Sequence, residues 1–255
     1  MLFCKRRPQR MPCVRIGSVN IQVEESMKYL GVLIDRTWSF REHVKYIECK
    51  SAKVTRSLSR LMPNLRGPGE RKRQLYATIV TSVIMYAVPV WGRELSSFPA
   101  KALSTLRRIQ RTVAIRVTAA YRTVSFDACT LLARMPPWSL EASFRCRVFE
   151  RIQDLKRSGE YTQQTDKKIR DEEANTLLRQ WDTLLGNPNN WGNYTTSAVR
   201  LHLNKWMSRG HGELNYFSTQ ILTGHGSFGH FLYRIRKKDF TVCTVLTEMT
   251  LPSTQ

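Results

Sequence analysis

The chain has 255 residues, enough for one large domain or two small domains with real cores. Its 42% hydrophobic and 10% aromatic content excludes a disordered basic tail. A formal net charge of +21 indicates a polyanionic partner. The sequence shows neither a lipidation signal nor a basic amphipathic anchor beside a hydrophobic span, so we expect no membrane partner.

The positive charge is concentrated in the first part of the chain. Residues 1–157 hold 30 Lys and Arg against 11 Asp and Glu, a net charge of +19. Residues 158–255 hold 11 against 9, a net charge of +2. Because contacts to phosphates come mainly from Lys and Arg, we expect the first 157 residues to carry any nucleic-acid-binding surface.

The cysteines indicate a reducing environment. Six cysteines are scattered without paired spacing, and no secretory signal precedes them. We therefore expect a nuclear or cytoplasmic protein that is neither secreted nor membrane-bound. The uncharged run at 74–92 contains polar residues and Pro89, which predicts a buried helix and not a membrane span.

Alternating apolar and polar residues predict short strands near the N-terminus. Residues 14–16 and 19–23 flank Gly17-Ser18, a pattern typical of a β-hairpin. A third strand is expected at 27–34.

Helical patterns dominate from residue 39 onward. Apolar residues spaced by four and three between Phe40 and Leu61 predict a helix with a basic outer face, and Ser39-x-x-Glu42 is a candidate capping box. A second helix at about 70–91 should bend near Pro89. The remaining helices are expected at about 100–120, 126–133, 140–155, 167–185, 196–208, 213–223 and 227–237. The predicted fold class is α+β and predominantly α-helical, with a small N-terminal β-hairpin or three-strand element, a helical bundle and a C-terminal helical module.

Three motifs that could indicate chemistry lack the surroundings that the chemistry needs. The segment 224–229 satisfies G-x-G-x-x-G, but a predicted helix precedes it, so a helix C-cap and loop is the better interpretation. His225 and His230 have no Cys-x-x-Cys pair nearby, which disfavours a zinc site. His43 and Cys49 face different sides of one predicted helix, since six residues correspond to a rotation of about 600°. We expect no catalytic residue, no metal site and no cofactor in this chain.

An ordered series of segments carries a family resemblance. Residues 27–35 read MKYLGVLID, and W-S-F-x-x-H follows at 38–43. These segments resemble the part after the catalytic core of non-LTR retrotransposon reverse transcriptases, in which a K-Y-L-G-V strand lies in the primer-grip hairpin before a helix that opens F-x-x-H-I. Further matches, in order, are LSRLMPN at 58–64, Gly67-Pro68, TSVIMYAVPVW at 81–91, LRRIQR at 106–111, AYRTVS at 120–125, Pro136-Pro137, WMSRGHG at 206–212 and LTGHG at 222–226. The series spans roughly residues 2–243 and is most similar to the Pol polyproteins of insect type-1 retrotransposable elements.

The resemblance implies roles for particular residues. A primer-grip-like segment, which would help to position a primer end, comprises Lys28, Tyr29, Leu30, Gly31 and Val32. The helices at 40–120 would track a duplex. The expected phosphate contacts on their basic faces are Lys50, Lys53, Arg56, Arg71, Lys72, Arg73, Arg107, Arg108 and Arg111.

Two departures from the family pattern bear on activity. The family's catalytic Asp-Asp motif lies upstream of the hairpin, and two-metal phosphoryl transfer needs that carboxylate cluster. Any Mg²⁺ would therefore belong to a catalytic palm that precedes this sequence. Near Cys243 the family has Cys-x-x-Cys followed by His and Cys, whereas Leu246 stands three positions after Cys243 here.

The resemblance also implies a division of the chain. We expect the end of a reverse-transcriptase palm with the primer-grip-like hairpin at 1–36, and a thumb-like helical bundle at 37–158. A C-terminal helical module at 159–240 and a divergent tail with a broken zinc knuckle at 241–255 would follow.

The leading hypothesis for function is binding without catalysis. The chain would be a fragment or remnant of a retrotransposon-encoded reverse transcriptase that binds RNA, DNA or an RNA–DNA hybrid through phosphates. An alternative is an incomplete gene model of an active RNA-directed DNA polymerase, which an in-frame Tyr/Phe-Ala-Asp-Asp upstream of Met1 would favour and a stop codon would disfavour. A further alternative is a decayed product with no selected function, against which cooperative unfolding would count.

Overall fold

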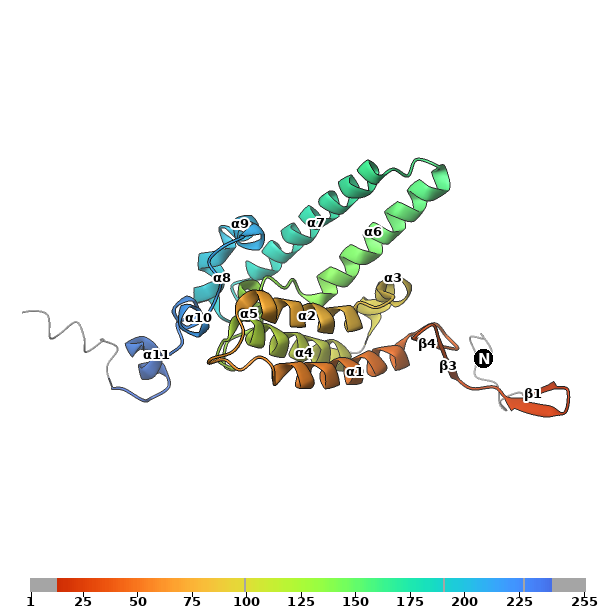
Figure 1. The fold of residues 1–255 in the computed structure, drawn as a ribbon, viewed down its shortest axis with the longest axis horizontal. Coiled ribbons are helices and arrows are strands. Elements are labelled where there is room, and N and C mark those ends of the chain that lie inside the picture. The colour runs from red at the N-terminus through yellow and green to blue at the C-terminus, as the bar shows by residue number, and fades with distance from the viewer. Residues whose placement is uncertain (1–12, 99, 190, 227, 240–255) are drawn as a thin grey trace, which may run out of the picture.

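A computed structural model describes residues 13–98, 100–189, 191–226 and 228–239 (Figure 1). The predicted tail at 241–255 lies outside the described residues. The described chain is mostly helical, with small strand pairs on its N-terminal side, which confirms the predicted fold class. In this part of the chain no helix has the length and apolar character that crossing a bilayer would require.

Two separate antiparallel hairpins lie before the helices. The first pairs β1 (Cys13–Ile16) with β2 (Val19–Gln22) around Gly17-Ser18, as predicted. The second pairs β3 (Ser26–Tyr29) with β4 (Val32–Asp35). The prediction of one continuous strand at 27–34 was therefore wrong. Leu30 and Gly31 both have positive φ, 45° and 86°, and so form a tight turn whose twist suits a hairpin.

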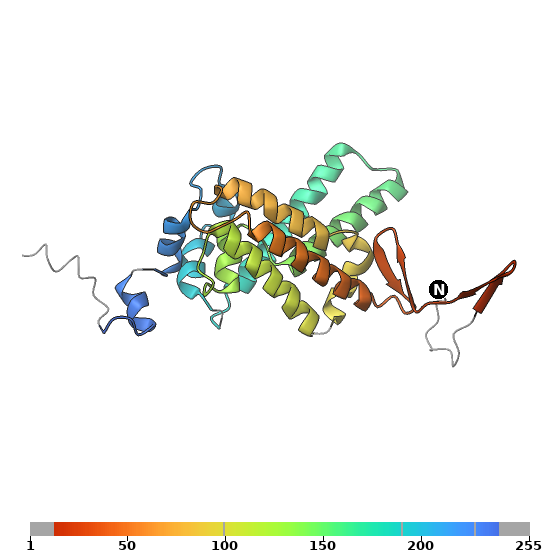
Figure 2. The same cartoon turned by 60° about the horizontal axis from the view of Figure 1, so that its bottom comes forward.

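The first hairpin stands away from the helices. Its register places Val14 opposite Ile21 and Ile16 opposite Val19, so these four apolar side chains share one face. All four are exposed. Figures 1 and 2 show this hairpin extended beyond the end of the helical body, so it adds nothing to the core of the described chain.

Twelve helical segments follow in the described residues. The first six are α1 (Arg41–Ser59), α2 (Glu70–Ile84), α3 (Val88–Trp91), the 3-10 helix η1 (Gly92–Ser97), α4 (Ala100–Thr118) and α5 (Phe126–Leu132). The other six are α6 (Trp138–Ser158), α7 (Gln163–Leu185), α8 (Asn193–Arg200), α9 (Leu203–Ser208), α10 (Tyr216–Thr223) and α11 (Gly229–Arg234). Both views show α1, α2 and α4 side by side, with α6 and α7 projecting as an antiparallel arm (Figures 1 and 2).

Two local predictions about helix ends were wrong. Phe40, in the left-handed conformation, precedes α1 without any side-chain cap, because the Ser39 hydroxyl donates instead to Asp35 Oδ2 at 3.0 Å. The helix predicted at 70–91 breaks before Pro89 and does not merely bend. Proline clashes with the carbonyl four residues earlier, and α2 ends at Ile84, just before Met85. Trp91 Nε1 donates to the carbonyl of Tyr86, which the break leaves open, at 2.9 Å.

The main core lies among α1, α2 and α4. It contains the stripe predicted for α1, including Phe40, Val44 and Ile47, and the large side chains of Trp91 and Trp138. Burial of these apolar side chains explains why the amphipathic helices pack together, at roughly 1.5–3 kcal/mol for each large side chain.

Two smaller clusters join the C-terminal helices to this bundle. One gathers Leu131 and Leu132 of α5 around Trp181 of α7, together with Leu185, Val199, Leu203 and Leu214. The other packs Val148 and Ile152 of α6 against Ile169 of α7. The predicted boundary at 158/159 thus falls between two helices that pack on each other.

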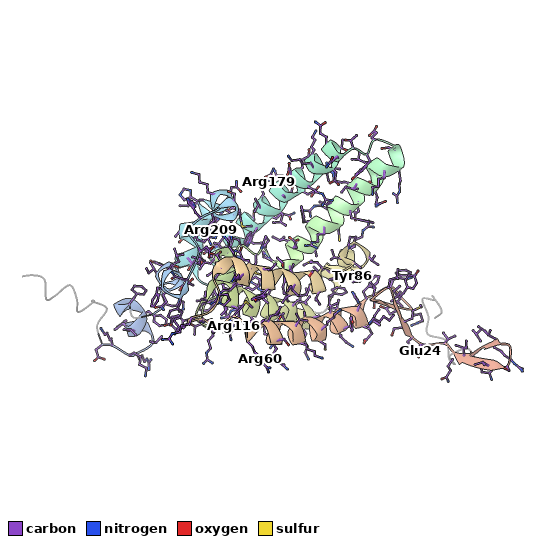
Figure 3. All side chains as sticks on the ribbon, viewed as in Figure 1. Glu24, Arg60, Tyr86, Arg116, Arg179 and Arg209 are labelled. Atoms are coloured by element: carbon purple, nitrogen blue, oxygen red, sulfur yellow. The ribbon has the colours of Figure 1, made fainter. Side chains whose placement is uncertain are left out.

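A buried carboxylate fastens the C-terminal helices to α2. Glu70 is 1% exposed and accepts hydrogen bonds from Arg209 at 2.7 and 2.9 Å and from the backbone N–H of Leu214 at 2.5 Å. Arg134 reaches the same carboxylate at 3.4 Å and donates to the carbonyl of Arg209 at 3.0 Å. Figure 3 labels Arg209, which lies where the C-terminal helices meet α2. We call Glu70, Arg134, Arg209 and Leu214 the Glu70 latch.

Candidate nucleic-acid interface

The basic outer face of α1 follows from its amphipathic pattern. Packing holds one side of the helix against the core, so residues one or two positions away from the buried stripe point outward. Lys50, Lys53 and Arg56 are exposed there. Neither Lys53 nor Arg56 contacts an acidic side chain in the described residues. The Lys50 ammonium lies 5.8 Å from the centre of the Tyr46 ring.

Helix α4 provides a second basic face beside α1. Leu106, Ile109 and Val113 are buried, whereas Arg107 and Arg108 are exposed. Arg107 pairs with Asp127 at 3.4 Å, and its guanidinium lies 4.3 Å from the centre of the Phe126 ring. No carboxylate in the described chain lies within salt-bridge distance of Arg108.

A groove of about 610 Å³ runs between these two helices. Its charged lining residues are Arg56 and Arg60 on the α1 side and Arg108 and Arg116 on the α4 side. Its other lining residues are Ala52, Thr55, Ser59, Thr105, Ile109 and Thr112. Figure 3 labels Arg60 and Arg116 on the two helices. We call this feature the α1–α4 groove; every charged side chain that lines it is an arginine.

Arg60 and Arg116 were missed as site residues, although the sequence held a signal for both. Arg60 follows Arg56 by four residues and Arg116 follows Arg108 by eight, spacings that place side chains on one face of a helix. What the sequence could not supply is the pairing of α1 with α4, which turns two basic faces into one groove.

The basic residues at the start of α2 differ in their surroundings. Lys72 is exposed and has no salt-bridge partner in the described chain. Arg71 is exposed as well, but it pairs with Glu213 at 3.0 Å and donates to the carbonyl of Gly210 at 2.9 Å. It therefore also helps to hold the C-terminal helices against α2.

Two predicted phosphate contacts are structural arginines. Arg73 is 4% exposed and donates to three carbonyls, of Pro68 and Arg116 at 2.7 Å and of Pro63 at 2.5 Å. Arg111 donates through Nε to the carbonyl of Val124 at 2.9 Å and through a terminal nitrogen to that of Arg122. These donors are engaged by backbone carbonyls in the structure, and contacts of Arg73 and Arg111 with phosphate stay a prediction.

The primer-grip-like segment lies beside the first half of α1 and beside Tyr86, which follows the end of α2. The Tyr86 hydroxyl donates to the Leu30 carbonyl at 2.7 Å, which holds the turn in place. A Cβ on Gly31 would lie 3.1 Å from the Tyr86 ring. Tyr29 is exposed and Val32 is buried in the main core.

Lys28 and Lys50 approach one tyrosine beside this turn. Lys28 Nζ donates to the Tyr46 hydroxyl at 3.3 Å and lies 4.9 Å from the centre of its ring. The hydrogen bond from Lys28, with the charges of Lys50 and Lys28, holds the pKa of Tyr46 below its usual value. The two lysines and Tyr46 line a pocket of about 400 Å³ with Tyr86 and His43.

Protonation of His43 should couple stability to pH. This side chain is buried, accepts a hydrogen bond from the Leu33 N–H at Nδ1, and has an unpartnered Nε2 in the described chain. Burial lowers the pKa of His43 from 6.5 to about 4. The unfolded chain then binds more protons between those values, so stability is complete above pH 6.5 and falls as the pH drops toward 4.

We expect the free energy of unfolding to fall by about 2 kcal/mol more between pH 7 and pH 5 in the native protein than in His43→Phe. Urea titrations followed by circular dichroism at the two pH values measure this difference. Equal pH dependence in the two proteins would show that His43 does not carry the effect.

Gly224 and His225, which belong to the segment that matches G-x-G-x-x-G, have structural roles. Gly224 ends α10 in the left-handed conformation, which confirms the predicted C-cap. His225 packs 4.9 Å from Phe231 and 6.2 Å from Tyr121, between ring centres. Within the described residues no group of three or more His, Cys, Asp or Glu is arranged to hold a metal ion.

Comparison with known proteins finds relatives of this chain among retrotransposon proteins. It is 28% identical over 247 residues to a retrovirus-related Pol polyprotein from type-1 retrotransposable element R1 of Bradysia coprophila, aligning 92% of the chain with 24% of that protein. The chain is a homologue of R1 retrotransposon Pol polyproteins. It is also 24% identical to a putative 115 kDa protein in element R1DM of Drosophila melanogaster, over 95% of the chain and 24% of that protein.

The alignment with a third relative covers a larger share of that relative's length. The Pol polyprotein of element R1 4 of Nasonia vitripennis is 22% identical over 94% of the chain and 62% of that protein. The chain spans about a quarter of the length of each of the first two relatives. No protein-family model and no solved structure matches the chain. The homology confirms the resemblance found in the sequence and supports a retrotransposon-derived, reverse-transcriptase-related chain.

Proposed function

We propose that this chain binds nucleic acid through backbone phosphates, as part of a retrotransposon-derived, Pol-related protein. The observation that carries the proposal is the α1–α4 groove, which four arginines line from the α1 and α4 sides, with no carboxylate among its described lining residues. Such a surface neutralises phosphates without reading bases. RNA, DNA and an RNA–DNA hybrid are all candidate ligands, because all three carry the same phosphodiester.

The exposed basic residues outside the groove extend this surface. Lys53 is an exposed residue of α1, and Lys72 is an exposed residue at the start of α2. The net charge of +19 in residues 1–157 would raise the local concentration of a polyanion and accelerate its association. The nearly neutral C-terminal helices are proposed to support the bundle through the Glu70 latch and not to supply the main binding surface.

Salt dependence tests the proposal. The logarithm of the binding constant for a labelled duplex should fall linearly with the logarithm of the KCl concentration, because bound phosphates release counterions. Arg56→Gln should reduce the magnitude of that slope by about one. Fluorescence anisotropy with DNA, RNA and hybrid duplexes of equal length measures both the slope and the preference.

Lys168→Gln is the matched control. Lys168 is an exposed residue of α7, on the arm that projects away from α1, and its loss changes the net charge equally (Figure 1). The slope should be unchanged in this variant. No binding by the native chain at low salt, with all three duplexes, would overturn the proposal.

A further inference from the structure

Two buried hydroxyl groups on the α1 wall of the α1–α4 groove have no hydrogen-bond partner among the described residues. Thr55 is 6% exposed, and neither its Oγ1 nor the Oγ of Ser59 is paired among the described residues. Both residues line the groove. Neighbouring hydroxyls behave differently: Ser57 donates to the Lys53 carbonyl at 3.2 Å, and Thr112 donates to the Arg108 carbonyl at 2.9 Å.

These unpaired hydroxyls need an explanation, because buried polar groups in folded proteins nearly always find a partner. Leaving a buried hydroxyl unpaired is unfavourable, whereas a valine or alanine at the same place would carry no such penalty. The hydroxyls are therefore suited to a ligand that presents acceptor oxygens within the groove.

The arginines specify the charge of that ligand. Arg56 and Arg60 are one helical turn apart, a rise of about 6 Å, and Arg108 and Arg116 are two turns apart, a rise of about 12 Å. Arg116 makes one long contact, 3.5 Å, to the Met62 carbonyl. A row of guanidinium groups along both walls matches a linear polyanion better than a single small anion.

One carboxylate lies close to the groove without lining it. Glu48 is on α1, about two turns before Thr55, and its Oε1 is buried and unpaired in the described chain. Burial raises the pKa of Glu48, although the charges of Arg108 and Lys45 oppose this shift. Its charge reduces the positive potential near Arg108, with which it interacts.

We infer that the α1–α4 groove is a dedicated phosphate-binding site for one strand of the nucleic acid. Arg56, Arg60 and Arg108 neutralise consecutive phosphates there, while Thr55 and Ser59 donate hydrogen bonds to phosphate oxygens. This inference rests on the proposed function but goes further, because it requires a built site and not a diffuse basic surface. The same positive charge would attract an acidic protein segment. Its carboxylates are planar and are spaced by a peptide backbone, so they should match the groove less well than the phosphates of a nucleic-acid strand.

The decisive variant changes no charge. Thr55→Val combined with Ser59→Ala should weaken binding of a hybrid or DNA duplex about three- to ten-fold at every salt concentration, with an unchanged salt slope. Thr183→Val on α7 is the matched control, because its exposed hydroxyl donates to the Arg179 carbonyl at 3.0 Å and should not affect binding. Thermal unfolding of the double variant should be unchanged or shifted upward, since two unpaired hydroxyls have been removed.

A second pair of variants tests the arginines. Arg56→Gln with Arg60→Gln should lower the magnitude of the salt slope by about two, whereas Lys167→Gln with Lys168→Gln on α7 should leave it unchanged. In the native protein, the Nε–Hε NMR signals of Arg56, Arg60 and Arg108 should shift on titration with the duplex. Poly-glutamate of equal charge should shift them less and compete weakly.

The outcomes separate the two proposals. If the native chain binds with a steep salt slope but the groove variants behave like their α7 controls, the groove inference fails and the proposed function stands. If the native chain binds no duplex at low salt, both fail. Equal competition by poly-glutamate would also overturn the phosphate assignment.

Discussion

Replacing Glu70 with alanine is expected to lower the free energy of unfolding by about 3–5 kcal/mol. The carboxylate is almost completely buried and is the shared partner of Arg134, Arg209 and the Leu214 N–H. Its removal takes away the carboxylate acceptor of the Arg209 guanidinium and of the Leu214 N–H, and one contact of Arg134, in a site that admits little water. The resulting penalty exceeds the modest net stabilisation that an intact pair usually provides. Urea denaturation followed by circular dichroism measures the loss.

Glu42→Ala provides the matched control for this prediction. Glu42 pairs with Lys45 on α1 at 2.7 Å, but both side chains are mostly exposed, at 52% and 69%. Water and salt screen such a pair, so the substitution should cost less than about 1 kcal/mol. Similar losses for the two variants would show that the Glu70 latch does not behave as a buried network.

Hydrogen exchange should also locate the damage in Glu70→Ala. Besides the contacts of Arg71, bonds from α10 also hold the C-terminal helices: Thr219 donates to the Thr118 carbonyl at 2.6 Å, and Tyr216 donates to the Tyr121 hydroxyl at 2.8 Å. We expect amides of α9 and α10 to lose protection before those of α1. Uniform loss across the chain would indicate global destabilisation without local release of the C-terminal helices.

The second large effect is expected at Arg73. Arg73→Met should destabilise the protein by about 2–4 kcal/mol, because the carbonyls of Pro63, Pro68 and Arg116 would lose one charged donor group. Arg73→Lys should recover little of this loss, since an ammonium on a flexible stem cannot reproduce the planar fork that reaches all three carbonyls. Thermal and urea unfolding of both variants measure the effect.

Lys72→Met, at the residue directly before Arg73, is the matched control for Arg73→Met. Lys72 carries the same charge but is exposed, so its loss should change stability by less than about 0.5 kcal/mol. Under the proposed function, Lys72→Met should weaken duplex binding at low salt while leaving the unfolding transition in place. If Arg73→Met were as stable as Lys72→Met, the bridging role of Arg73 would be wrong.

Local sequence rules predicted elements well where neighbours in the chain decide the outcome. The apolar period between Phe40 and Leu61 predicted α1, and Gly17-Ser18 predicted the first hairpin. The same rules failed where two local preferences compete. The residues around Leu30-Gly31 follow a continuous β pattern, so the sequence did not predict the turn there. The Tyr86 hydroxyl helps to hold this turn by donating to the Leu30 carbonyl. The capping box at Ser39 failed because Asp35 accepts hydrogen bonds from both the N–H and the hydroxyl of Ser39, and Phe40 takes the N-cap position of α1.

The sequence alone determined the charge asymmetry, the amphipathic helices and the kinship with R1 Pol polyproteins, because each depends only on composition or on the order of residues. It could not determine which basic residues remain free. From the sequence, Arg73 and Arg111 were predicted to be surface cations, but in the structure they donate to the backbone carbonyls of Pro68 and Val124. Arg56 and Arg108 have no salt-bridge partner among the described residues, and they line one groove only because α1 packs against α4. An arginine's role depends on which acceptors come within about 3 Å of its guanidinium, and the tertiary structure alone decides that.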